Sequence, residues 1–178
     1  RDEFWLESLF SERITKWLDF LDLRDSYGGL VSTRGFVEYL LEAMGKTRFQ
    51  ELEIPLKIIA TDFWERRQVV FRRGELAPAI GASMAIPGVF APVEYRRHVL
   101  VDGGLVNPLP YDVLQDACDL TIAVDVQGRV EPRAGTAPTY FETTFNSLQS
   151  MAATIPRACL DARPPDIYVA PDIRNISV

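Results

Sequence analysis

Residues 99–108 read VLVDGGLVNP, and this stretch decides more about the chain than any other. Its apolar start predicts a short strand over residues 98–101 that ends at Asp102. In open α/β sheets, an acidic residue at the carboxyl end of a buried strand faces the crevice where ligands bind. Gly103 and Gly104 lack a Cβ atom and permit positive φ, so a second backbone or a substrate can approach closely. Asp102 is therefore a candidate functional carboxylate, and a tight turn in which it only bonds backbone amides stays open as the alternative.

Helices and strands are expected to alternate on both sides of this stretch. A first helix is expected at residues 2–23, followed by a break at Gly28-Gly29. A second helix is expected to begin at a cap on Ser32 or Thr33 and to end at Gly45. Further helices are expected at 76–84, 111–117 and 140–160, the last bent at Pro156. Strands are expected at residues 54–62, 68–72, 98–101, 120–126 and 166–169, with loops at 85–93 and 128–138. The nearly continuous apolar run at 120–126 predicts a strand buried on both faces. The alternation favours an α/β sandwich with a mixed or parallel sheet.

Composition narrows the classes of function. The 178 residues are 47% hydrophobic and 25% charged, as in an ordinary globular domain, and no apolar run is long enough to span a membrane. The net charge of −6 argues against a nucleic-acid partner. All but three of the 19 basic residues are arginine, and Arg-Arg pairs occur at 66–67, 72–73 and 96–97. These pairs are either solvated or form a local patch for phosphate or carboxylate groups.

Metal and disulfide chemistry find little support. Cys118 and Cys159 lie far apart in apolar surroundings and fit small buried side chains better than a disulfide framework. One histidine and two cysteines nearly exclude a His/Cys metal site, whereas counting does not exclude a carboxylate site. No G-x-G-x-x-G or Walker A pattern supports nucleotide binding.

Ser83 lies in Gly81-Ala82-Ser83-Met84-Ala85, which superficially resembles the G-x-S-x-G nucleophile elbow of serine hydrolases. An elbow requires a buried strand before the serine and a helix after it. Here an alanine-rich helix precedes Ser83, and a Pro-Gly pair follows within a few residues. Ser83 is therefore expected to be structural.

His98 is the only histidine, so it is the only candidate for the imidazole base of a Ser-His-Asp triad. His98 and Asp102 are expected on one side of one strand, about 13 Å apart, so they cannot form the His–Asp pair of a triad. His98 is expected to be partly exposed beside Arg96-Arg97, and the base of a hydrolase would then be a carboxylate. Asp62 and Asp125 also end predicted strands, where a turn or cap is favoured over a substrate-side role.

Six blocks of the sequence, in this order, resemble bacterial patatin-like phospholipases. They are residues 59–62 (IATD), 73–76 (RGEL), 82–93 (ASMAIPGVFAPV), 101–104 (VDGG), 107–110 (NPLP) and 122–125 (IAVD). The resemblance is best over residues 54–126. It implies a three-layer α/β/α hydrolase fold with a Ser-Asp dyad, in which Asp102 is the acid and Gly103 and Gly104 complete its motif.

The family's other catalytic elements are absent from residues 1–178. Its nucleophilic serine, in a G-x-S-x-G elbow, and its glycine-rich oxyanion loop both precede the blocks found here. The resemblance therefore implies that residues 1–178 are the C-terminal portion of one patatin-like catalytic domain, truncated at both ends and lacking the strand-elbow-helix portion. By itself this portion is expected to be inactive. Because its sheet edge is open, it is expected to be poorly stable alone, or to pair with the missing portion, a second copy or segments outside this sequence.

The implied function is lipid acyl hydrolysis, with a lipid or phospholipid ester as substrate and with no cofactor or metal. The apolar loop containing Ile86, Pro87, Val89 and Phe90 is expected to border the acyl pocket. The alternative is a catalytically inactive patatin-like module that binds lipid or a partner. The resemblance also suggests a bacterial cytoplasmic or peripheral membrane protein that meets membrane surfaces transiently. The sequence leaves the oligomeric state undetermined.

Overall fold

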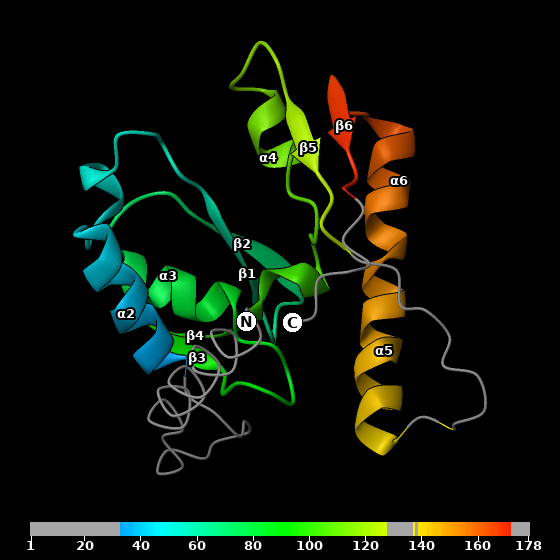
Figure 1. The fold of residues 1–178 in the computed structure, drawn as a ribbon, viewed down its shortest axis with the longest axis horizontal. Helices are drawn as coiled ribbons and strands as arrows, with labels where there is room; N and C mark the ends of the chain where they lie inside the picture. The colour runs from blue at the N-terminus through cyan, green and yellow to red at the C-terminus, as the bar shows by residue number, and fades with distance from the viewer. Residues whose placement is uncertain (1–32, 128–136, 138, 172–178) are drawn as a thin grey trace, which may run out of the picture. The chain divides into compact units, whose positions relative to one another are not determined.

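The structure is a computed structural model, and it describes residues 33–127, 137 and 139–171. The expected helix at 2–23, the Gly28-Gly29 break, Ser32 and nearly all of the expected 128–138 loop lie outside the described residues. The chain divides into two parts between Gly103 and Gly104, and each is described by itself (Figure 1).

A four-stranded antiparallel sheet forms the centre of the first part. Its strands are β1 (Ile58–Asp62), β2 (Arg67–Phe71), β3 (Val93–Tyr95) and β4 (His98–Asp102), in the order β2-β1-β4-β3. Ala60 lies opposite Asp102 in the β1–β4 register. The expectation of a mixed or parallel sheet is wrong for this part, because the short turns after β1 and β3 allow only antiparallel hairpins.

The sequence analysis did not predict strand β3. It assigned residues 85–93 to a loop, and β3 begins at the last of these residues. Val93 and Tyr95 are both half-buried on either side of the exposed Glu94, so the alternation that could have revealed β3 is only three residues long. The two-residue turn into β4 places Arg96 at a φ of 58°. The inner strand β1 begins four residues later than expected, after Pro55.

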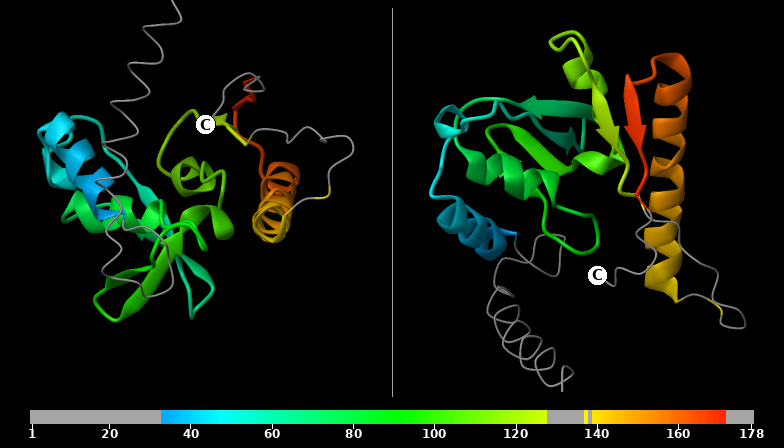
Figure 2. Two further views of the ribbon diagram at one scale, coloured as in Figure 1. Left: turned by 60° about the horizontal axis from the view of Figure 1, so that its bottom comes forward. Right: turned by 45° about the horizontal axis from the view of Figure 1, so that its top comes forward.

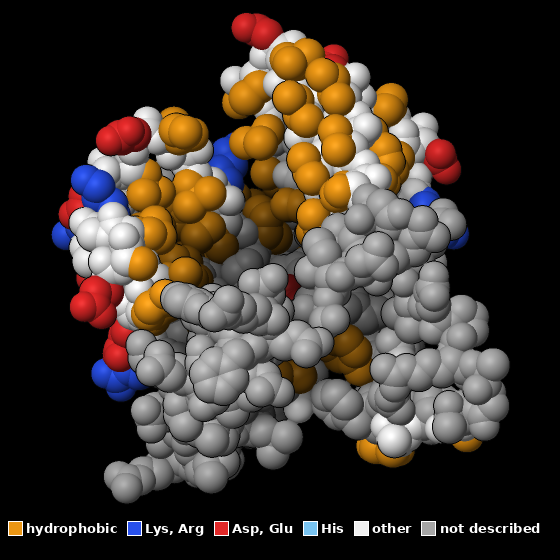
Figure 3. Space-filling view, viewed as in Figure 1, with side chains coloured by type: hydrophobic (Ala, Val, Ile, Leu, Met, Phe, Trp, Pro, Cys, Tyr) orange, Lys and Arg blue, Asp and Glu red, His pale blue; other side chains and the backbone are white. Residues whose placement is uncertain are grey.

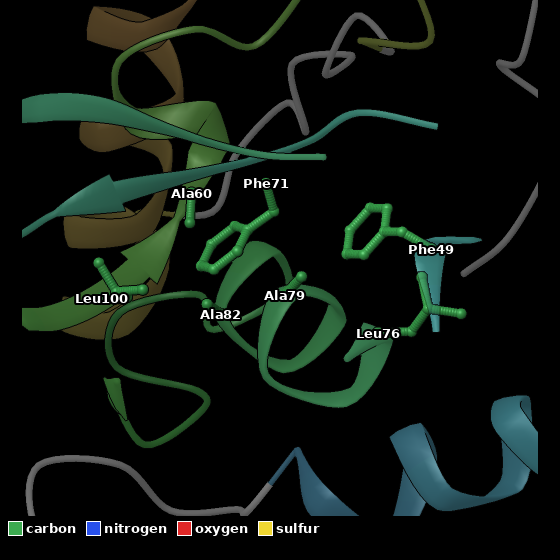
Figure 4. Close-up of a cluster of buried hydrophobic side chains, with 7 residues drawn as sticks. All are labelled: Phe49, Ala60, Phe71, Leu76, Ala79, Ala82 and Leu100. Carbon is green, nitrogen blue, oxygen red and sulfur yellow. The ribbon is translucent and has the colours of Figure 1, made fainter. Parts of the chain in front are cut away.

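Helix α3 (Leu76–Ser83) forms where the alanine-rich sequence predicted a helix, and it packs against β1 and β4. Ala79 and Ala82 are fully buried, and their small side chains let the helix approach the sheet. The core gathers around this helix (Figure 4). Its buried members are Phe49, Ala60, Phe71, Leu76, Ala79, Ala82 and Leu100.

Helix α2 (Arg34–Met44) packs on α3 (Figure 2). Thr33 occupies the expected N-cap position but makes no side-chain capping bond, and Gly45 ends the helix at a φ of 60°. A Cβ on Gly81 would lie 3.1 Å from Thr33 Oγ1, so glycine permits the close packing of the two helices. A short 3-10 helix, η1 (Phe49–Glu51), follows α2.

The second part contains a parallel pair of strands, β5 (Ile122–Val124) and β6 (Ile167–Val169). Helix α4 (Asp112–Gln115) is shorter than the expected 111–117. The buried side chains of Leu109, Tyr111 and Ala123 form a small core against which Cys159 packs. The Tyr111 hydroxyl also donates to the Arg163 carbonyl at 3.0 Å.

The expected helix at 140–160 is two helices, α5 (Tyr140–Ala152) and α6 (Thr154–Ala162), interrupted at Ala153. Pro156 lies in the first turn of α6. Its nitrogen carries no hydrogen and cannot bond the carbonyl four residues earlier, at Ala152. The helix is therefore interrupted three residues before the expected bend at Pro156, which itself lies within α6.

Strand β5 is not buried on both faces as expected. Ala123 is buried, whereas Ile122 and Val124 are 54% and 51% exposed. Hydrophobic side chains gather on the surface over β5 and β6 (Figure 3). The apolar run identified a strand, but nothing among the described residues covers its second face. Within the described ranges, no helix is long and apolar enough to cross a membrane.

Candidate active site

Asp102 lies at the end of β4, and both of its backbone groups are hydrogen-bonded. Its N–H donates to the Ala85 carbonyl at 3.0 Å, and its carbonyl accepts the Thr61 hydroxyl at 2.7 Å. Thr61 is buried on β1, and Ala85 follows α3 closely. Because a strand and a helix end each provide one contact, the backbone of Asp102 is fixed on both sides while its side chain stays partly exposed.

Gly103 follows Asp102 and is buried against β1. A Cβ atom at this position would lie 2.3 Å from the Ile59 carbonyl oxygen and 2.7 Å from the Ile59 carbonyl carbon. Real Cβ atoms do not approach backbone this closely, so only glycine fits without moving a strand. Gly103 and Gly104 both lie in the 3-10 helix η2 (Gly103–Leu105), and neither has a positive φ. The expected role in close approach is thus confirmed at Gly103, but left-handed backbone is not the reason.

Asp62 ends β1 and is almost fully buried. Its Oδ1 atom accepts the N–H groups of Trp64 and Glu65 at 3.1 and 3.0 Å, which confirms the predicted turn. Its Oδ2 atom lies 2.6 Å from His98 Nδ1. The bond from Glu65 contributes most to holding the pKa of Asp62 below its ordinary value, the contact with His98 adds to it, and desolvation opposes both.

His98 is partly exposed, as expected, with 44% of its side chain accessible. The sequence prediction missed its pairing with Asp62. His98 and Asp102 occupy the two ends of β4, whereas the antiparallel register brings His98 beside the end of β1. Only the register between β1 and β4 reveals this pairing, and a single sequence does not provide that register.

Asp125 and Ser83 occupy structural positions. Asp125 accepts the Gln127 N–H at 2.9 Å and the Tyr168 hydroxyl at 2.8 Å, and the latter bond is the main reason why the pKa of Tyr168 is raised. Ser83 is the last residue of α3, so a helix rather than a strand precedes it, as expected. This geometry is not that of a nucleophile elbow.

A family model described as patatin-like phospholipase matches residues 1–114. The chain belongs to this family. The match includes Asp102, Gly103 and Gly104, and it confirms the patatin-like α/β fold class indicated by the sequence blocks.

Relatives of this chain include proteins from bacteria and from insects. Uncharacterized NTE family proteins of Mycobacterium bovis and Mycobacterium tuberculosis are each 38% identical to this chain over 130 residues, which cover 71% of this chain and 35% of each relative. Neuropathy target esterase of Drosophila melanogaster is 31% identical over 121 residues, covering 66% of this chain and 8% of the relative. The chain therefore spans about a third of the length of the mycobacterial relatives and much less of the insect one.

The loop expected to border the acyl pocket begins immediately after Ala85, the residue that holds the Asp102 N–H. In this patatin-like chain, Ile86, Pro87, Val89 and Phe90 are all half-buried. The Ile86 carbonyl accepts the N–H groups of Val89 and Phe90 at 3.1 and 2.9 Å, which folds the loop into a turn. A separate open depression of about 400 Å³ is lined by Met44, Lys46 and residues 52–56, and none of the four expected pocket residues lines it.

The described residues contain no group of three His, Cys, Asp or Glu side chains that could hold a metal ion. Of the residues expected at the site, the structure places Asp102 and Gly103 together at the end of β4. Thr61 and Ala85 are additional contributors that the sequence did not reveal, because their contacts with Asp102 span 41 and 17 positions of the chain.

Proposed function

We propose that this chain supplies Asp102 as the acid of a Ser-Asp dyad in a lipid acyl hydrolase, and that the nucleophilic serine lies upstream of residue 1. Residues 1–178 would then be part of one patatin-like catalytic domain. The observation that carries the proposal is the fixed backbone of Asp102, bonded to Thr61 and Ala85 at the end of a buried strand. Membership of a phospholipase family supports a lipid ester as substrate.

In the proposed reaction, Asp102 accepts the proton of the serine hydroxyl as the serine oxygen attacks the ester carbonyl. The protonated acid then gives this proton to the departing alkoxide as the tetrahedral intermediate collapses to an acyl-enzyme. Water hydrolyses the acyl-enzyme, with Asp102 again accepting a proton and returning it to the serine. A carboxylate is a weak base toward a hydroxyl group, so the reaction depends on exact positioning, which the two backbone bonds of Asp102 provide.

The test is Asp102→Asn in the longer protein that contains the serine. Asparagine keeps the shape and cannot accept the proton, so turnover of a chromogenic ester should fall by roughly 10²–10⁴-fold. Thermal unfolding should be nearly unchanged, because asparagine keeps the size of the side chain and the backbone bonds to Thr61 and Ala85 do not depend on the carboxylate. Asp119→Asn, on an exposed residue of the second part, is the matched control and should keep full activity.

Turnover near the wild-type level in Asp102→Asn would refute the dyad assignment. Residues 1–178 alone serve as the negative control, since the proposed nucleophile lies outside them. If the longer protein has no G-x-S-x-G elbow and no esterase activity, the alternative of an inactive lipid-binding or interaction module is favoured.

The loop that starts after Ala85 is the proposed border of the acyl pocket. In the longer protein, Val89→Asp should lower kcat/KM for a long-chain ester about tenfold more than for a short-chain ester. A tenfold difference is at the low end of what is expected, because burying an unsatisfied polar group costs ~1–3 kcal/mol. Ile54→Asp is the control, since Ile54 is exposed in the segment before β1. Equal losses on both esters would place the acyl chain elsewhere.

A further inference from the structure

Two hairpin turns lie side by side at the end of the four-stranded sheet opposite Asp102. The β1–β2 turn and the β3–β4 turn are joined by the Asp62–His98 contact at 2.6 Å and by the bond from Phe63 N–H to the Val99 carbonyl at 2.9 Å. The side chains at these turns form what we term the hairpin tip surface. Its members are Phe63, Trp64, Arg66, Arg67, Arg96 and Arg97, all exposed.

Aromatic side chains stand at this surface instead of packing in the core. Trp64 is 73% exposed and Phe63 48% exposed, and their rings meet edge to face with centroids 4.9 Å apart. The backbone of Trp64 is fixed by its N–H bond to the buried Asp62 carboxylate. Tryptophan is enriched at membrane–water interfaces, where its apolar ring and polar N–H suit the headgroup level.

Four exposed arginines lie on the same two turns as these rings. Among the described residues, Arg66, Arg67 and Arg97 form no ion pair, and Arg96 lies over the Tyr95 ring at 5.3 Å. The exposed carboxylates at the same turns are those of Glu65 and Glu94, while that of Asp62 is buried and bound to His98. The tip is therefore locally cationic in a chain whose net charge is −6.

We propose that the hairpin tip surface docks onto the anionic face of a lipid bilayer, with Trp64 and Phe63 entering the headgroup region and the arginines binding lipid phosphates. The guanidinium fork matches phosphate oxygens bidentately, and each arginine near an anionic leaflet strengthens binding about fivefold. An exposed aromatic pair with four arginines on the same two turns satisfies both requirements of interfacial binding, apolar insertion and charge attraction. His98 and Asp102 lie at opposite ends of β4, about 13 Å apart along the strand, so this surface is distinct from the proposed catalytic end.

The proposal is tested by flotation of the longer protein with vesicles of phosphatidylcholine alone and of phosphatidylcholine mixed with phosphatidylserine. We expect binding to the mixed vesicles, weakened by salt, and roughly 25-fold weaker binding for the double variant Arg66→Gln/Arg97→Gln. The matched control is Arg72→Gln/Arg73→Gln, which removes the same charge from the exposed pair beyond the other end of β2 and should bind normally. Equal loss in both double variants would refute a local docking surface.

Insertion of Trp64 into the bilayer is measured separately, by quenching of its fluorescence. Trp5→Phe/Trp17→Phe leaves Trp64 as the only tryptophan of residues 1–178, and brominated lipids in the mixed vesicles should quench its fluorescence. Tyr39→Ala, on an exposed residue of α2, is the control for Trp64→Ala, which should lose binding. No quenching, or tight binding to single-stranded RNA without binding to vesicles, would overturn the proposal. Vesicle binding is measured without turnover, so its outcome is independent of the Ser-Asp dyad.

Discussion

At the scale of single residues, Asp102 and Gly103 have separable roles. Asp102 carries the proposed chemistry, and its backbone is held by Thr61 and Ala85. Gly103 is required by packing, because its Cβ position is occupied by the Ile59 carbonyl. Both residues stand out in the sequence, but the steric reason for the glycine depends on the distance between β1 and the end of β4.

Gly103→Ala tests this packing. Because the nearest obstacle is backbone 2.3 Å away, the alanine must displace a strand, and the free energy of unfolding should fall by about 1–3 kcal/mol. Gly81→Ala is the control. Its Cβ would lie 3.1 Å from a side-chain hydroxyl, so this substitution should lower the free energy of unfolding by less than Gly103→Ala does. Urea unfolding measures both. Equal stability of Gly103→Ala and the wild type would show that the two strands can separate freely.

At the scale of elements, the sequence predicted the helices with clear ends and missed what depends on pairing. Gly45 ends α2 and the alanine-rich α3 occupies its expected place, because local conformational preference decides both. The strand β3 and the Asp62–His98 contact were not predicted, because each depends on antiparallel register between segments distant in sequence. The exposed face of β5 was not predicted for a similar reason, because an apolar run does not specify which elements cover the strand.

The Asp62 carboxylate accepts the Glu65 N–H and contacts His98 of the neighbouring hairpin, and its lowered pKa predicts a pH dependence. The pKa of Asp62 is lowered in the folded state, so the folded chain binds fewer protons than the unfolded chain, and the stabilisation is complete above the ordinary value of 3.8 and declines below it. Asp62→Asn should therefore destabilise the protein at neutral pH, and the difference from wild type should shrink as the pH falls below 3.8. Urea unfolding at several pH values measures this difference. A difference that grows on acidification would contradict the assigned role of the carboxylate.

At the scale of the whole molecule, family and fold class were predictable from six short blocks, because their order along the chain is more specific than any one motif. The family model confirms the assignment over residues 1–114. The proposed site was predictable only at Asp102, Gly103 and Gly104. Its positioning contacts come from β1 and from the segment after α3, and they become apparent only once the sheet is assembled.

The steric requirement at Gly103 has a consequence for how relatives of this chain are interpreted. A glycine that the backbone favours this strongly is expected in a descendant that keeps the fold, including one that no longer hydrolyses anything. The first glycine of an Asp-Gly-Gly motif is thus a marker of architecture, whereas the proposed chemistry depends on the aspartate before it. A homologue with glycine at position 103 and no acid at 102 should be counted as a folded patatin-like protein without this base.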